Sequence, residues 1–106
     1  EIPSNISFGV SDEAYVMGLL DCIGELKRHV FDRIRNGDLE DAKRIFGIME
    51  NLYLMLYPLA SYDKILKETR RKLDVNRGLV EDVRGAITEE IRRNELINAI
   101  KNLKLN

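Results

Sequence analysis

The 106-residue chain contains one cysteine, two prolines, no tryptophan and no long run of apolar residues. A single cysteine, Cys22, can form neither an internal disulfide nor a cysteine-type zinc site, which favours a reducing, intracellular setting. The absence of a stretch of about 18 apolar residues excludes a membrane-spanning helix. Residues 1–4 also lack the basic start and apolar core of a signal peptide. These absences predict a cytoplasmic protein with no membrane partner.

The net charge is −1, from 17 basic and 18 acidic residues. A balance this close to zero excludes a polybasic protein whose average charge alone would hold nucleic acid. Charge is nevertheless uneven along the chain, because residues 1–25 contain five acidic residues and no basic residue. Residues 64–77 are uneven in the opposite direction, with six basic residues and two acidic ones. This stretch either binds along the phosphates of a nucleic acid or forms a solvated helix face. The six are Lys64, Lys67, Arg70, Arg71, Lys72 and Arg77.

Apolar residues at steps of three and four predict a first helix of about 25 residues. Residues 1–10 show no period and are predicted to form an extended lead-in, after which Ser11 suits the N-cap. Gly37 is expected to end the helix in a left-handed conformation, and Asp38 can cap the next helix. The apolar stripe of this first helix is Tyr15, Leu19, Ile23, Leu26, Val30 and Ile34.

Two further helices are predicted. The second ends at Pro58 and carries apolar residues at Ala42, Ile45, Met49, Leu52 and Leu56. Ser61 is the candidate N-cap of the third, which has a seam with seven-residue spacing that suits a long helix packed lengthwise on its neighbours. The seam consists of Leu66, Leu73, Val80 and Ile87, with Thr69, Asn76 and Val83 between them. Residues 94–105 are again amphipathic and form either a short fourth helix or a continuation.

No segment alternates with a period of two, which argues against β-strands. The length suffices for one domain with a core and is too small for two. We therefore predict an all-α fold, an antiparallel bundle of three long helices plus a short C-terminal helix or extension, forming a single helical domain over residues 1–106. Because the chain begins at Glu1 rather than methionine, we expect a processed product or a piece of a longer protein.

Asp21 and Glu25 are four residues apart, so their carboxylates project from one face of the first helix. Like charges at this spacing repel by roughly 0.2–0.5 kcal/mol. A bound hard cation such as Mg²⁺ would reverse that cost, since such cations take oxygen ligands. The acidic pair therefore indicates either a metal site or a solvated helix face. Asp21 lies between Leu20 and Cys22, in the most apolar part of the helix.

Four tyrosines offer rings that could stack on nucleic-acid bases. Three of them continue helical apolar stripes, which favours packing in the core, and Cys22 is expected to pack as a small apolar residue. The tyrosines are Tyr15, Tyr53, Tyr57 and Tyr62.

Residues 15–28 have the pattern Y-x-x-G…D-x-x-G-E-L-x-R and are followed by an Asn-Gly-Asp corner at residues 36–38. This order and spacing resembles the translin family, and the likeness continues through residues 49–53 and 80–82, over about residues 11–92. The resemblance implies all-α proteins about twice this length, which assemble into closed oligomeric shells and bind RNA or single-stranded DNA inside. The present chain resembles their C-terminal half.

The nuclease branch of that family, translin-associated factor X, has an Asp four residues before the Glu of G-E-L, where translin has an apolar residue. Asp21 matches the nuclease branch. The resemblance implies that Asp21 and Glu25 are catalytic ligands of a Mg²⁺ site, completed by an E-x-x-E pair from an earlier helix. No such pair precedes residue 11, so we expect an N-terminal half to supply it. Arg28 matches the family arginine and would either steady a phosphate or pair with Glu25.

The resemblance therefore implies an RNA-binding, Mg²⁺-dependent endoribonuclease that forms a homo-oligomer or joins a translin-like partner. The nucleic-acid-binding residues would be Arg28, Lys64, Lys67, Arg70 and Arg71. One alternative is a non-catalytic binder of single-stranded nucleic acid, whose binding would be sensitive to salt without any Mg²⁺ dependence. Another is a helical oligomerisation domain whose apolar seam meets partner helices.

Overall fold

The computed structural model describes residues 10–61, 65 and 67–105. This part of the chain forms helix α1 (Val10–Arg35), helix α2 (Leu39–Leu56), the short 3-10 helix η1 (Tyr57–Ser61) and helix α3 (Lys67–Leu105). It contains no strand, and the all-α prediction with three long helices is confirmed. Val10, expected at the end of the lead-in, is the first residue of α1, whereas residues 1–9 lie outside the described part.

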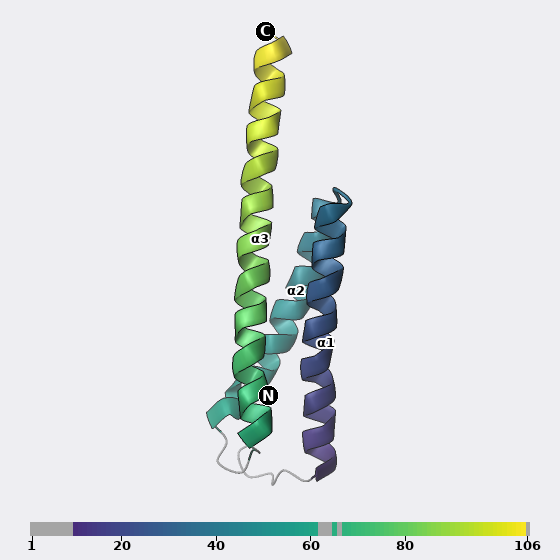
Figure 1. Ribbon diagram of the computed structural model, residues 1–106, viewed down its shortest axis with the longest axis vertical. Coiled ribbons are helices and arrows are strands. Elements are labelled where there is room, and N and C mark those ends of the chain that lie inside the picture. Colours follow the sequence, from purple (N-terminus) through teal and green to yellow (C-terminus); the bar gives the residue numbers. More distant parts are fainter. Residues whose placement is uncertain (1–9, 62–64, 66, 106) are drawn as a thin grey trace.

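All three helices contact one another. In Figure 1, α1 and α3 rise in the same direction, and α2 returns behind them at an oblique angle. The shape is elongated, with extents of 65 × 20 × 19 Å, because the C-terminal end of α3 extends beyond α1 (Figure 1). Residues 94–105 therefore continue α3 and form no separate fourth helix.

The corner between α1 and α2 forms as the sequence predicts. Gly37 has a φ of +79°, in the left-handed region that glycine adopts without steric cost. The amide of Gly37 donates to the Ile34 carbonyl at 3.0 Å, and that of Asp38 donates to the Arg33 carbonyl at 2.8 Å. The Asp38 carboxylate then accepts from the Asp41 amide at 3.1 Å, so Asp38 is the N-cap of α2.

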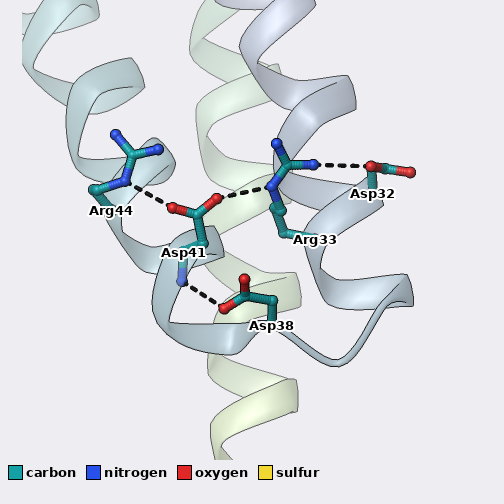
Figure 2. Close-up of polar contacts among 5 residues, drawn as sticks. All are labelled: Asp32, Arg33, Asp38, Asp41 and Arg44. Carbon is teal, nitrogen blue, oxygen red and sulfur yellow. Dashed lines mark hydrogen bonds and ion pairs between the residues drawn. The ribbon is translucent and has the colours of Figure 1, made fainter.

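A network of ion pairs joins the end of α1 to the start of α2, as Figure 2 shows. The Asp41 carboxylate accepts from Arg44 Nε at 2.7 Å and from Arg33 Nε at 2.8 Å. Arg33 Nη1 also donates to Asp32 at 2.9 Å. The hydrogen bond from Arg44, followed by that from Arg33, holds the pKa of Asp41 below its usual value. The corner is thus held by charge as well as by its turn geometry.

The core consists of one buried stripe from each helix. The seam of α3 is buried from Thr69 onward as predicted, and Leu66 lies outside the described residues. The predicted stripe of α1 is partly wrong, because Tyr15 is 69% exposed while Val16 and Leu20 are buried. Apolar residues 15, 16, 19 and 20 fit two overlapping stripes, and packing against the other helices selects the second. The buried apolar residues of α1 and α2 are Val16, Leu20, Ile23, Val30, Ala42, Ile45, Met49 and Leu56.

Two buried polar contacts set the position of α3 along α1. Thr69 Oγ1 donates to the buried Glu13 carboxylate at 2.6 Å. One heptad later, Asn76 Nδ2 donates to the Leu20 carbonyl at 3.2 Å. Because buried polar groups need partners, a shift of α3 along α1 would break both hydrogen bonds.

The connection between α2 and α3 differs from the prediction at one point. α2 ends before Pro58 as expected, but Ser61 does not cap α3, which begins at Lys67. Ser61 instead ends η1, where its hydroxyl donates to the Pro58 carbonyl at 3.0 Å. The reason is tertiary, since Leu59 of η1 is buried in the core and draws this segment into a separate short turn.

We predict that Asp41→Asn lowers stability at neutral pH and has little effect in acid. The pKa of Asp41 is lowered in the folded protein, so its stabilisation is full above its ordinary value of 3.8 and is lost as the pH falls through the folded-state pKa. Urea unfolding of both proteins at about pH 7 and about pH 2.5 measures this. Glu89→Gln on the exposed face of α3 is the control. A stability difference that is independent of pH would contradict the prediction.

Candidate functional site

Asp21 and Glu25 lie one turn apart on the solvent-facing side of α1, and each side chain is 63% exposed. The spacing thus places both carboxylates on one face, as predicted. Their apolar neighbours in the sequence do not surround them, because Leu20 is buried while Asp21 turns outward. Cys22 is also exposed, so the expectation that it packs as a small apolar residue is wrong.

Each carboxylate has a cationic partner. Lys72 Nζ of α3 lies 2.6 Å from Asp21 Oδ1, and Arg28 Nη1 donates to Glu25 Oε1 at 3.2 Å. Of the two roles considered for Arg28, the ion pair with Glu25 is therefore present. Exposed pairs of this kind contribute at most about 1 kcal/mol each. The side chains of Lys72 and Arg28 can therefore leave these carboxylates for other ligands at a small cost in free energy.

The described residues fit only part of a Mg²⁺ site. Among them, no three or more His, Cys, Asp or Glu side chains are grouped so that they could hold a metal ion. Mg²⁺ requires a near-octahedral set of oxygen ligands. Asp21 and Glu25 can supply one side of such a set, and the other protein ligands would have to come from another segment or chain.

The basic stretch does not form one continuous surface. Arg70 turns toward η1, where its Nε donates to the Ala60 carbonyl at 2.9 Å. Arg77 lines a groove between α2 and α3. Lys64 lies outside the described residues. A stretch that is contiguous in sequence is therefore divided among different sides of α3, because successive helical residues point in different directions.

Part of the stretch does gather beside the acidic pair. Arg71 and Lys72 line a surface hollow of about 220 Å³ together with Glu68 and Val75. Lys67 is exposed one turn before Arg71. Because Lys72 also contacts Asp21, this hollow adjoins the Asp21 carboxylate of α1.

Lys72 is the residue that the predicted binding set omits. It lies between the seam residues Thr69 and Asn76, at a position that flanks the buried side of α3. Flanking positions of a heptad seam commonly pair with charges on the neighbouring helix. The seam spacing of α3, together with the acidic residues of α1, was the signal in the sequence that could have identified Lys72. A second cross-helix pair, Lys27 with Asp82 at 3.8 Å, follows the same α1–α3 boundary.

Comparison with known proteins identifies the chain at the level of its family. The Translin family model matches residues 2–87, which include every candidate site residue. The chain belongs to the Translin family. Membership supports, for the family as a whole, a nucleic-acid-binding or oligomerising helical domain. No helix in the described part of this Translin-family chain is long and apolar enough to cross a membrane.

One curated relative of this Translin-family chain is an uncharacterized protein of Methanocaldococcus jannaschii. The two are 34% identical over 96 residues, which cover 91% of this chain and 43% of the relative. The chain thus spans less than half the length of that relative. No solved structure matches the present chain.

We predict that the Asp21–Lys72 pair contributes less than about 1 kcal/mol to the free energy of unfolding, because both side chains are substantially exposed. A double-mutant cycle with Asp21→Asn and Lys72→Gln, followed by urea unfolding, measures the coupling. The same cycle on the less exposed Arg33–Asp41 pair is the matched comparison and should give the larger coupling. A coupling of several kcal/mol between Asp21 and Lys72 would make this pair structural.

Proposed function

We propose that this Translin-family chain binds single-stranded RNA at the α1–α3 boundary and supplies part of a Mg²⁺-dependent endoribonuclease site. The contact between Asp21 and Lys72 carries the proposal. It joins a pair of carboxylates, which are suited to a cation, to a hollow where Arg71 and Lys72, beside Glu68 and Val75, could hold a phosphate. In metal-dependent cleavage of a phosphodiester the carboxylates hold the ion beside the scissile phosphate, and cationic side chains nearby can position that phosphate.

The hollow at Arg71 and Lys72 would hold a backbone phosphate. Arginine presents a planar fork that matches phosphate oxygens, and lysine adds a compact positive charge. Lys67, one turn away, extends the positive surface along α3. Since the ion pairs of Lys72 and Arg28 are exposed, both cations can move from a carboxylate to a phosphate at small cost.

Asp21 and Glu25 would be the ligands that this chain gives to Mg²⁺. When bound, the ion would activate water and neutralise charge on the scissile phosphate. The same exposed face of α1 carries Gly18, and a Cβ atom built there meets nothing within 4 Å. A further helix that brings carboxylates could therefore approach α1 closely. The chain covers 43% of the Methanocaldococcus relative, which is consistent with a source of these carboxylates outside the chain.

The expected oligomer, whether of identical chains or with a translin-like partner, is also part of the proposal. The end of α3 supports it, because residues 92–104 are all exposed although several of them are large and apolar. A surface of this kind is unusual on a helix that stays solvated. The apolar residues are Leu96, Ile97, Ile100 and Leu103.

A second candidate function is RNA binding without cleavage. It is favoured by the lack of a third metal-ligating side chain near Asp21 among the described residues. In this case Lys67, Arg71 and Lys72 would bind the strand, and the acidic pair would only orient neighbouring cations. The two functions differ in their Mg²⁺ dependence, because RNA binding by lysine and arginine side chains alone needs no metal ion.

We predict that Asp21→Asn and Glu25→Gln each slow RNA cleavage by the native protein roughly 100-fold or more, about 2.7 kcal/mol in activation free energy. RNA affinity should be retained or should rise, because each change removes a negative charge. Cleavage of a labelled single-stranded RNA with and without Mg²⁺, beside a binding titration, measures both quantities. Glu89→Gln, more than four turns from Lys72 along α3, is the control.

Normal cleavage by the Asp21→Asn protein would exclude Asp21 as a ligand of the metal site. Salt-sensitive binding by the unaltered protein with no Mg²⁺-dependent cleavage would favour the second candidate.

A further inference from the structure

The groove between α2 and α3 that Arg77 lines has a volume of about 420 Å³. Its lining among the described residues comes from α2, η1 and α3, so it is separate from the Asp21 site on α1. Val80 and Ala60 contribute apolar surface, and Tyr53 and Tyr57 contribute aromatic rings. An apolar surface with a few polar groups around it is the usual form of a small-ligand site.

The two tyrosines present a flat aromatic surface in this groove. Their ring centroids are 6.1 Å apart and their planes differ by 21°. Tyr53 packs partly against the core, and its burial raises the pKa of its phenol. Tyr57 is 52% exposed, so the expectation of packing in the core is wrong for this ring and for Tyr15, whereas Tyr62 lies outside the described residues. A stacked pair with one ring open to solvent can receive a further planar group.

The charged residues of the groove are mixed in sign. Arg84 is held by Glu50 at 2.5 Å and by Glu81, which offsets its charge. Asp74 and Arg77 lie near enough to Tyr53 for their charges to act on its phenol. A site with such carboxylates suits a neutral ring that donates hydrogen bonds better than it suits a phosphate alone. Asp and Glu accept hydrogen bonds from exocyclic amino groups of bases, and Arg77 can reach an adjacent phosphate.

We propose that this groove holds one unstacked, amino-bearing base of a single-stranded nucleic acid, stacked on Tyr57 and Tyr53. The inference rests on the proposed function, since both require the chain to bind a single strand. It adds a contact that recognises bases at a place separate from the phosphate hollow of α3. A planar base fits the ring pair, and its amino group matches Asp74 and Glu81.

The absence of tryptophan makes tyrosine fluorescence a direct test, because the four tyrosines supply the intrinsic emission. The full chain is titrated with oligocytidylate, with oligouridylate and with an abasic oligomer of the same length. We expect oligocytidylate to quench the emission and to bind about 5- to 150-fold more tightly than the abasic oligomer. Oligouridylate should bind less tightly than oligocytidylate, because uracil lacks the exocyclic amino group.

Three variants assign the effect to the groove. Tyr57→Leu should reduce the affinity for oligocytidylate to that for the abasic oligomer, whereas Tyr57→Phe should keep it because the ring remains. Tyr15→Leu is the matched control, since Tyr15 is exposed on α1 and does not line the groove. Circular dichroism and thermal unfolding check that each variant is folded.

The outcomes separate this inference from the proposed function. Equal binding of the base-containing and abasic oligomers, without quenching, would overturn the inference and leave phosphate binding at α3 intact. Wild-type affinity and quenching in a folded Tyr57→Leu protein would also overturn it. Equal affinity for oligouridylate and oligocytidylate would overturn the amino preference. Failure of every oligomer to bind would contradict both proposals.

Discussion

The seven-residue spacing of the buried side of α3 determines where the other side chains of this helix lie. Thr69, Asn76 and Val83 face α1 and α2 together with the apolar seam residues between them. Contacts of Thr69 with Glu13 and of Asn76 with Leu20 fix the helix against sliding. Once the seam is fixed, the neighbouring basic residues must lie on different sides of α3, because each successive residue is rotated by about 100° around the helix axis. The hollow at Arg71 and Lys72 and the tyrosine groove both follow from this constraint.

Two sets of ion pairs in the described part of the chain differ in exposure. At the α1–α2 corner, Asp41 is 27% exposed and is held by two arginines, an arrangement that stabilises the turn. At the α1–α3 boundary, Asp21 is 63% exposed and has one flexible lysine partner. Water screens the second kind of pair, so its partners can be exchanged for a ligand. Exposure thus distinguishes Asp41, which stabilises the corner, from Asp21, which we propose as a metal ligand.

Features encoded by neighbouring residues were predictable from the sequence. The Gly37 corner, the Asp38 cap and the seam of α3 depend on local geometry and on period, and all three form as expected. The stripe of α1 and the start of α3 depend on tertiary packing, which the sequence pattern does not contain. The spacing of Asp21 and Glu25 is likewise local. The partnership of Asp21 with Lys72 joins two helices and appears only once the seam has oriented α3.

The most direct test of the proposed interface is a map of backbone amide chemical shifts in the nitrogen-15-labelled chain as single-stranded RNA is added. We expect large shifts in residues 21–28 of α1 and 67–72 of α3, and we expect them to diminish as salt is raised, because phosphate contacts release counterions. RNA binding that leaves both segments unshifted, or no binding at low salt, would contradict the assignment of this face to nucleic acid.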